Sequence, residues 1–311
     1  MSETIRTNFT FTSSDGTEIN VYKWTPKEEE IKGIVQISHG MAETAIRYER
    51  FAKVLNQNGY IVYANDHRGH GNTAEHIESL GYLGDNAGFN LLIGDIAKLS
   101  DIIREENGDL RIYLFSHSMG SFAAQRYIMD FKDKIDGLVL SGSNGEQGFT
   151  LNIARTIAKV EMLIRGRKAK SKLMNTLSFG AYNKKFKPEK TGSEWLSRDE
   201  EEVKKYIEDP YCGTIFPTSL YYDFLESLQN IQDESNFKKI PKDLPILIIS
   251  GEEDPVGDSG KGLKKLYNRY KEAGVKDLAI KLYPGARHEI LNEINRNEVM
   301  DDVVNWLDNR K

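Results

Sequence analysis

The sequence predicts an α/β protein in which a mostly parallel central sheet is flanked by helices and interrupted by an inserted helical cap. Apolar runs of strand length alternate with amphipathic helical stretches up to about residue 142, and the alternation resumes near residue 245. Between these points the patterns are helical, with no convincing strand. We therefore expect a core built from residues 1–142 and 237–311, with a helical cap over residues 143–236.

The elements of the expected core follow from local patterns. Its strands are short apolar runs bounded by turn residues, at 9–13, 19–24, 34–38, 60–64, 111–115, 138–141, 245–250 and 278–283. The first two are joined by a turn at Asp15-Gly16. Its helices have apolar residues at helical spacing, over 48–58, 90–106 and 122–131 and around 263–270 and 299–307. Strands that alternate with helices favour parallel pairing with helices on both faces.

Composition excludes several classes of protein. The 311 residues are 39% hydrophobic and 29% charged, which is typical of a globular protein. The net charge of −5 argues against general binding of nucleic acid. The single cysteine, Cys212, cannot form an internal disulfide, and no stretch resembles a signal peptide or a membrane span. We expect a cytoplasmic enzyme, and contact with a membrane surface stays open.

A serine stands where a strand is expected to turn sharply into a helix. Ser118 has Ser116 two positions before it and Gly120 two positions after it, and such a turn requires small residues at both places. Ser116 does not qualify as the nucleophile because Leu114 precedes it by two positions. The pattern departs from its usual form, which has glycine in place of Ser116. The helix that follows favours developing negative charge at its N-terminus. We predict that Ser118 is a nucleophile.

A serine hydroxyl needs a base, and in this class of fold the order along the chain is serine, acid, histidine. His288 is the histidine that follows the late strands, so it is the predicted base. The acid is expected where the preceding strand ends. Asp254 is preferred because Pro255 fixes the turn beyond it, with Asp258 and then Glu253 as alternatives.

The tetrahedral intermediate of ester cleavage requires two backbone donors. We expect them to be the N–H of Met119, directly after the nucleophile, and the N–H of Met41. His39 is expected to brace its own turn. His67 and His70 are interpreted as hydrogen-bonding loop residues, because no carboxylate or cysteine cluster accompanies them at metal-ligand spacing. The sequence therefore predicts no metal site.

Six segments together resemble the monoacylglycerol lipase and lysophospholipase family of α/β-hydrolases. They are residues 39–43, 47–48, 66–71, 116–120, 254–257 and 288–289, and two segments of the insertion, 195–199 and 209–213, resemble the cap of bacterial members. The resemblance implies a cap over the active site, long-chain monoglycerides or lysophospholipids as substrates, and no cofactor. The family also contains esterases for short or aromatic esters. Ser116 and Thr44 depart from the usual pattern.

The insertion combines apolar helical faces with positive charge. Its expected faces contain Ile153 and Ile157 on one helix and Leu220 and Phe224 on another, which either dock the cap or line an acyl site. From Arg155 to Lys190, eleven Lys or Arg face two Glu, a charge of +9, which leaves −14 for the rest. This segment is either a solvated surface or a contact for anionic lipid.

Together these patterns predict a carboxylic ester hydrolase that works through an acyl-enzyme. Ser118 attacks the ester, and His288 takes its proton and returns it to the leaving alcohol. A small-ester esterase is the alternative within enzymes, and an inactive ligand-binding member of the fold is the alternative outside them. The sequence does not indicate an oligomeric state.

Overall fold

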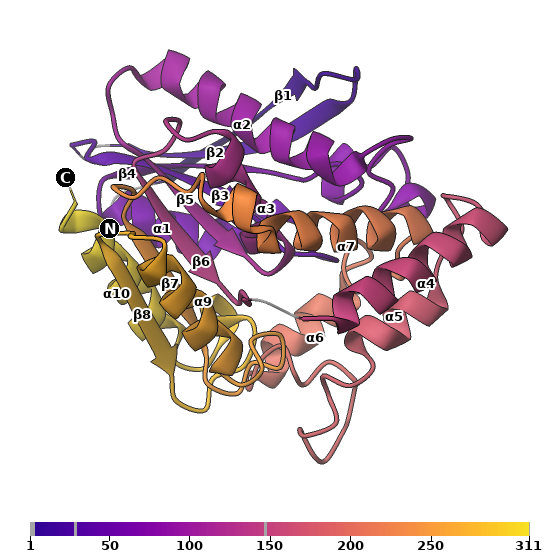
Figure 1. Ribbon diagram of the computed structural model, residues 1–311. Helices are drawn as coiled ribbons and strands as arrows, with labels where there is room; N and C mark the ends of the chain where they lie inside the picture. Colours follow the sequence, from indigo (N-terminus) through magenta and orange to yellow (C-terminus); the bar gives the residue numbers. More distant parts are fainter. Residues whose placement is uncertain (1–3, 28–29, 146–147, 311) are drawn as a thin grey trace.

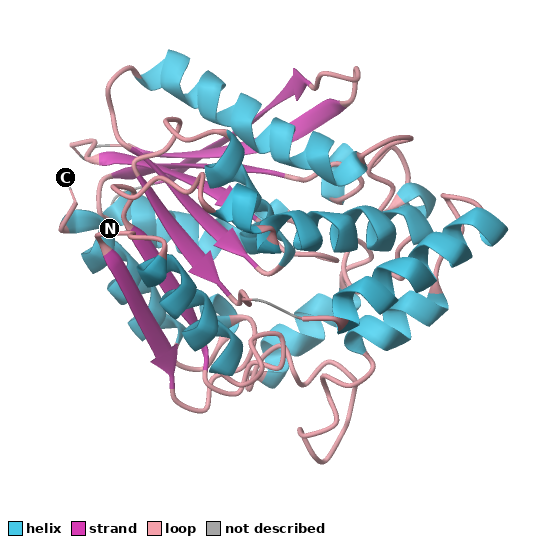
Figure 2. Ribbon diagram, in the orientation of Figure 1, coloured by secondary structure: helices cyan, strands magenta, loops and turns pink. Residues whose placement is uncertain are grey.

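The central sheet of the molecule has eight strands in the order β1-β2-β4-β3-β5-β6-β7-β8. The computed structural model describes residues 4–27, 30–145 and 148–310. The strands are β1 (Thr4–Thr12), β2 (Glu18–Pro26), β3 (Gly33–Ser38), β4 (Tyr60–Asn65), β5 (Ile112–His117), β6 (Gly137–Ser141), β7 (Ile246–Gly251) and β8 (Leu278–Tyr283). β1 and β2 pair antiparallel, β2 pairs antiparallel with β4, and the pairs from β4 to β8 are parallel. The predicted mostly parallel sheet is confirmed (Figure 2).

Helices cover both faces of this sheet, as predicted (Figure 1). α1 (Glu49–Gln57) and α10 (Arg296–Asp308) share one apolar cluster with one face of the sheet. α2 (Gly88–Asn107), α3 (Met119–Asp130) and α9 (Lys261–Glu272) belong to the cluster on the other face. Short 3-10 helices occur at Ala45–Tyr48 (η1), Gly71–Thr73 (η2), Ile77–Ser79 (η3) and Ile290–Asn292 (η4). Alternation along β5 supplies both clusters, since Leu114 faces one and Phe115 the other.

Between β6 and β7 the described chain is helical. The helices are α4 (Thr150–Arg165), α5 (Lys172–Phe179), α6 (Glu200–Glu208), α7 (Thr218–Gln232) and α8 (Glu234–Phe237). α7 lies against α2 and α3 in Figure 1, and its Phe224 ring is 5.3 Å from Phe89 and 5.6 Å from Phe122. α7 therefore belongs to the layer that covers the sheet, although it lies inside the stretch expected to be cap.

Two parts of the cap are distinguished below. Residues 194–206, which contact the loop of His288, are called the docked segment. α4 and α5 are called the outer pair. The outer pair exposes several large apolar side chains: Ile153, Val160, Leu163, Ile164, Leu173 and Leu177. Leu163 and Ile164 are 72% and 78% exposed. Among the described helices, none combines the length and apolar character needed to cross a bilayer.

Candidate active site

Ser118 occupies a strained turn between β5 and α3. Its backbone has φ 50° and ψ −120°, a conformation that residues other than glycine rarely adopt. The turn brings Gly120 so close to β3 that an added Cβ would lie 2.3 Å from the Ser38 carbonyl oxygen. Ser116 replaces the usual glycine without crowding, because its buried hydroxyl donates to the Val139 carbonyl at 2.8 Å on β6. The local geometry is that of a nucleophile elbow.

His288 and Asp254 meet beside this turn. The Nδ1 of His288 lies 3.0 Å from both carboxylate oxygens of Asp254, and both side chains are buried. Asp254 also accepts from the Ser250 hydroxyl at 2.7 Å and the Val256 N–H at 2.9 Å. Since Nδ1 donates to Asp254, Nε2 of His288 is left as the proton acceptor. Both His288 and Ser118 line the same pocket.

The charges of this pair are mutually stabilised. Burial opposes the charged form of His288, but the Asp254 carboxylate, together with Glu289 and Glu43, outweighs burial and raises the pKa of the imidazole above its ordinary 6.5. Burial likewise opposes ionisation of Asp254, and His288 with the hydrogen bonds holds its pKa below the ordinary value. The two alternative acids lie elsewhere: Asp258 is exposed, and Glu253 pairs with Lys185 at 2.7 Å.

The loop after β3 is fixed at both sides of Gly40. The Gly40 N–H donates to the Glu43 carboxylate at 2.5 Å. Nε2 of His39 accepts from the His67 N–H at 2.9 Å, so Nδ1 holds the proton and donates to the Gly40 carbonyl at 2.8 Å. In a trans peptide the carbonyl and the following N–H point in opposite directions, so the Met41 N–H points away from His39. Burial lowers the pKa of His39 to about 4, which keeps this tautomer neutral.

The second expected donor, the N–H of Met119, is in the first residue of α3. The first N–H groups of a helix have no partner within it, which leaves them available to an oxyanion. Met41 and Ser118 line the same pocket, and an added Cβ on Gly40 would lie 3.1 Å from the Ser118 Cβ. The loop that holds Met41 is therefore next to Ser118.

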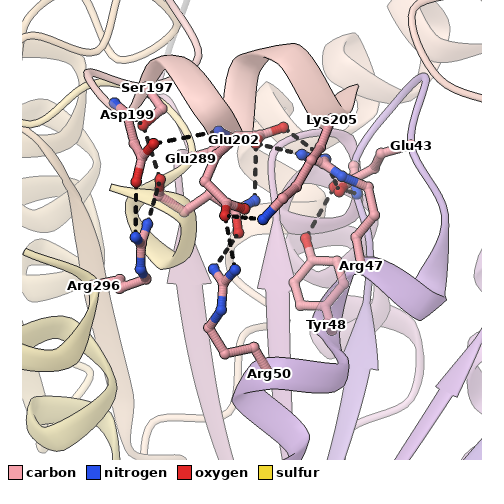
Figure 3. A network of polar contacts seen from close by, with 12 residues as sticks. Glu43, Arg47, Tyr48, Arg50, Ser197, Asp199, Glu202, Lys205, Glu289 and Arg296 are labelled. Carbon is pink, nitrogen blue, oxygen red and sulfur yellow. Dashed lines mark hydrogen bonds and ion pairs between the residues drawn. The ribbon is translucent and has the colours of Figure 1, made fainter. Parts of the chain in front are cut away.

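An ion-pair network connects the Gly40 loop to the His288 loop. Arg47 donates to Glu43 at 2.8 Å and to both oxygens of Glu289 at 2.8 and 2.7 Å (Figure 3). Its guanidinium also lies 5.0 Å from the ring centre of Tyr206 in α6. Burial opposes ionisation of Glu289, but Arg47 lowers its pKa to about 2. The two loops and the cap thus share one arginine whose side chain is 12% exposed.

The pocket at Ser118 lies between the core and the cap and has a cavity volume of about 180 Å³. Its cap wall includes both polar and aromatic side chains: Asn175, Phe179, Ser193, Trp195, Tyr206, Thr214 and Phe216. The four apolar residues expected to bind substrate lie outside its lining. Ile153 is 49% exposed and Ile157 lines a separate surface hollow, while Leu220 and Phe224 pack into the core. Helical periodicity identified apolar faces without showing which one turns toward Ser118.

Three buried histidines brace the loops behind the site. The rings of His39 and His67 are 4.2 Å apart, and that of His70 is 5.3 Å from His39. Burial lowers the pKa of His67 well below its ordinary value and that of His70 to about 3. Within the described residues, no group of three or more candidate ligands is arranged to hold a metal ion. Cys212 is buried, and burial raises the pKa of its thiol well above the usual range.

Sequence reasoning missed the residues of the cap wall, and Trp195 is the one among them that contacts the imidazole of His288. Trp195 lines the pocket, and its ring lies 5.0 Å from the imidazole of His288. Its segment was noted in the sequence only as part of a cap, since a tryptophan in an insertion gives no sign of which loop it reaches.

A family model described as "Serine aminopeptidase, S33", of the hydrolase type, matches residues 29–295. The monoacylglycerol lipase of Mycolicibacterium smegmatis is 26% identical, with 99% of each chain covered. The human monoglyceride lipase is also 26% identical, over 96% of this chain and 89% of that protein.

Among solved structures, a thermostable carboxyl esterase from Bacillus coagulans, in complex with glycerol, superposes with a TM-score of 0.91. It is 28% identical to this chain, and 98% of each chain is covered. The family model covers most of the chain, and the sheet, elbow and cap have the arrangement of an α/β-hydrolase. The chain belongs to the S33 serine aminopeptidase family of α/β-hydrolases.

Proposed function

We propose that the chain is a serine hydrolase of carboxylic esters, of the monoacylglycerol lipase type. The observation that supports this most is the buried His288–Asp254 pair beside a strained Ser118 in one pocket. Ser118 attacks the ester carbonyl, and His288 takes the proton and passes it to the leaving alcohol. The Met41 and Met119 N–H groups stabilise the oxyanion. Water then repeats the cycle on the acyl-enzyme.

The lining of the pocket supports an ester with an apolar acyl group and a small polar alcohol. Phe179 and Phe216 offer apolar surface, whereas Asn175 and Thr214 offer hydrogen-bonding groups from the cap. Monoglyceride lipases are among the relatives over nearly the full length of the chain, which favours monoacylglycerols as the substrate. The likeness to a carboxyl esterase keeps short-chain esters as the second candidate.

A fluorophosphonate probe tests the chemistry. The unmodified chain should be labelled covalently at Ser118, and Ser118→Ala should not. Ester turnover should fall by several orders of magnitude in Ser118→Ala and His288→Ala, and by less in Asp254→Asn. Asp258→Asn serves as the matched control and should keep its activity. Near-normal turnover in folded Ser118→Ala, or labelling at another residue, would contradict the assignment.

A panel of esters then distinguishes the two candidate substrates. Oleoyl glycerol, lysophosphatidylcholine and an acetate ester are compared by kcat/KM. The lipase assignment predicts the largest value for oleoyl glycerol. A clearly larger kcat/KM for the acetate ester would indicate that the protein is a short-chain esterase.

We also propose that the outer pair contacts lipid surfaces. Its exposed Leu163 and Ile164 stand in the segment of charge +9, near the exposed Lys159 and Lys172. Apolar residues within a basic surface favour the interface of an anionic membrane. Arg167 and Lys170 contribute less to such a surface, because Arg167 pairs with Asp223 and Lys170 donates to the Leu80 carbonyl.

Sedimentation with vesicles tests this contact. Binding should be stronger to phosphatidylglycerol than to phosphatidylcholine vesicles and should weaken with added salt. Leu163→Asp with Ile164→Asp should abolish binding, while turnover of a short dissolved ester survives. Ile207→Asp, at an apolar residue of α6 that is 48% exposed, is the matched control and should bind normally. Equal sedimentation with both lipids would leave the outer pair as a solvated surface.

A further inference from the structure

The imidazole of His288 is enclosed by groups from both the core and the cap. From the core, the His117 ring lies 4.6 Å away at an angle of 45°. Gly142, also in the core and with φ 58°, lies against another edge of the imidazole, since an added Cβ at Gly142 would lie 2.9 Å from Cε1 of His288. From the cap, the Trp195 ring lies 5.0 Å away at 33°. The surroundings of the His288 imidazole therefore include an aromatic ring from the inserted segment.

Trp195 is held in this position by its own main chain and by other rings. The His288 N–H donates to the Trp195 carbonyl at 3.3 Å, and the Trp195 N–H donates to the Asn183 side chain at 2.9 Å. Phe179 stacks on the indole at 6.2 Å, and Tyr182 packs against it at 5.0 Å. The ring is thus fixed before any substrate arrives.

We propose that Trp195 is a positioning residue for the base: its indole packs against the imidazole of His288, fixes the ring and stabilises the imidazolium that forms as Ser118 attacks. The inference rests on the proposed hydrolase function. An aromatic face attracts a cation within about 6 Å, and the attraction is larger where water is excluded. The neutral Nε2 accepts one proton from the Ser118 hydroxyl, so the ring becomes positive while the charge on oxygen moves to the ester.

The contribution of the Trp195 indole to the pKa of His288 can be separated from that of the other groups around the imidazole. Burial, with the neighbouring His288, lowers the pKa of His117 to about 4, so His117 stays neutral and offers a ring without a competing charge. The charged groups that act on His288 are Asp254, Glu289 and Glu43, and Arg47 pairs with the two glutamates. These groups set the acid limb of the pH profile, and removal of the indole should shift that limb without a change of charge.

Trp195→Leu is compared with Trp195→Phe, which keeps an aromatic face. Trp195→Leu should lower kcat on the pH plateau about tenfold and move the acid limb of kcat/KM to lower pH, because the cation is less stabilised. Trp195→Phe should keep both within about twofold of the unmodified chain. Phe186→Leu is the matched control: it removes a cap ring that contacts Arg287 instead of His288, so its acid limb should not move. If Trp195→Leu does not fold, Trp195→Met takes its place.

Labelling by a small fluorophosphonate separates this inference from the function on which it rests. The rate of labelling at Ser118 should follow the same shifted acid limb in Trp195→Leu. Unchanged kcat and acid limb in folded Trp195→Leu, with only KM raised, would overturn the inference and leave Trp195 as a wall for substrate. Failure of the unmodified chain to be labelled at all would overturn the hydrolase assignment together with the inference.

Discussion

In the docked segment, cap residues are joined to the core by main-chain hydrogen bonds and buried ion pairs, whereas the outer pair turns apolar side chains to solvent. The Glu289 N–H donates to the Leu196 carbonyl at 2.7 Å, and Arg198 pairs with the fully buried Glu293 at 2.8 Å. In the outer pair, Arg155 of α4 forms its salt bridge with the half-exposed Glu226. One insertion thus supplies part of the catalytic wall and a separate surface.

The largest difference between the two parts should appear in stability. Glu293 accepts hydrogen bonds from the N–H groups of Arg198, Arg287 and Ile294 and from the Arg198 side chain. Glu293→Ala leaves these donors without their acceptor, so we expect a loss of about 3 kcal/mol in the free energy of unfolding. Glu226→Ala, which removes the α7 partner of Arg155 in the outer pair, is the matched change and should cost less than about 1 kcal/mol. Urea unfolding measures both, and equal losses would remove the distinction.

A smaller effect is expected in the pH profile. His288 must be neutral to accept a proton, so kcat/KM falls as the pH drops below its pKa. Burial opposes the imidazolium, while Asp254 first and Glu289 next raise this pKa. Glu289→Gln removes one negative charge, so the acid limb should move to lower pH. Glu226→Gln should leave the limb in place. A limb that stays in place or moves to higher pH in Glu289→Gln would contradict the influence assigned to Glu289.

The smallest effect is expected where the outer pair is most exposed. Leu163→Gln should change the free energy of unfolding by no more than about 0.5 kcal/mol, because its side chain already lies in water. The same change at Leu196, which is buried in the docked segment, should cost several times more. Thermal unfolding compares the two variants. A large loss in Leu163→Gln would indicate that its surface is covered in solution.

The elements that sequence predicted well are those whose cause is local. Apolar runs and turn residues placed the strands of the core within a few residues, and the small residues around Ser118 predicted its turn. β1 begins at Thr4, earlier than predicted, because its polar residues pair with β2 at the edge of the sheet and leave no apolar signal. The sequence also proposed Asp254 and His288, which the structure brings together.

The cap could not be predicted to the same degree, because its contacts depend on how helices pack. Ile153 and Leu220 have the same periodic pattern, yet one is half exposed and the other fully buried. The role of Glu43 depends on a bond to the Gly40 N–H and on Arg47, which reaches Glu289 across 242 positions of sequence. Such partners depend on tertiary contacts that local patterns do not reveal.

The placement of α7 matters for anyone who wishes to exchange the cap between relatives. β6 and β7 are parallel neighbours, so the chain must return across the sheet between them, and α7 is the helix that makes this crossing. A transplant cut after β6 and before α7 would carry over the outer pair and the docked segment, and its α4 would have to fit the retained α7, with which Arg155 pairs through Glu226. A cut placed after α8 would remove the crossover as well, and the minimal core would lose the covering of α2 and α3.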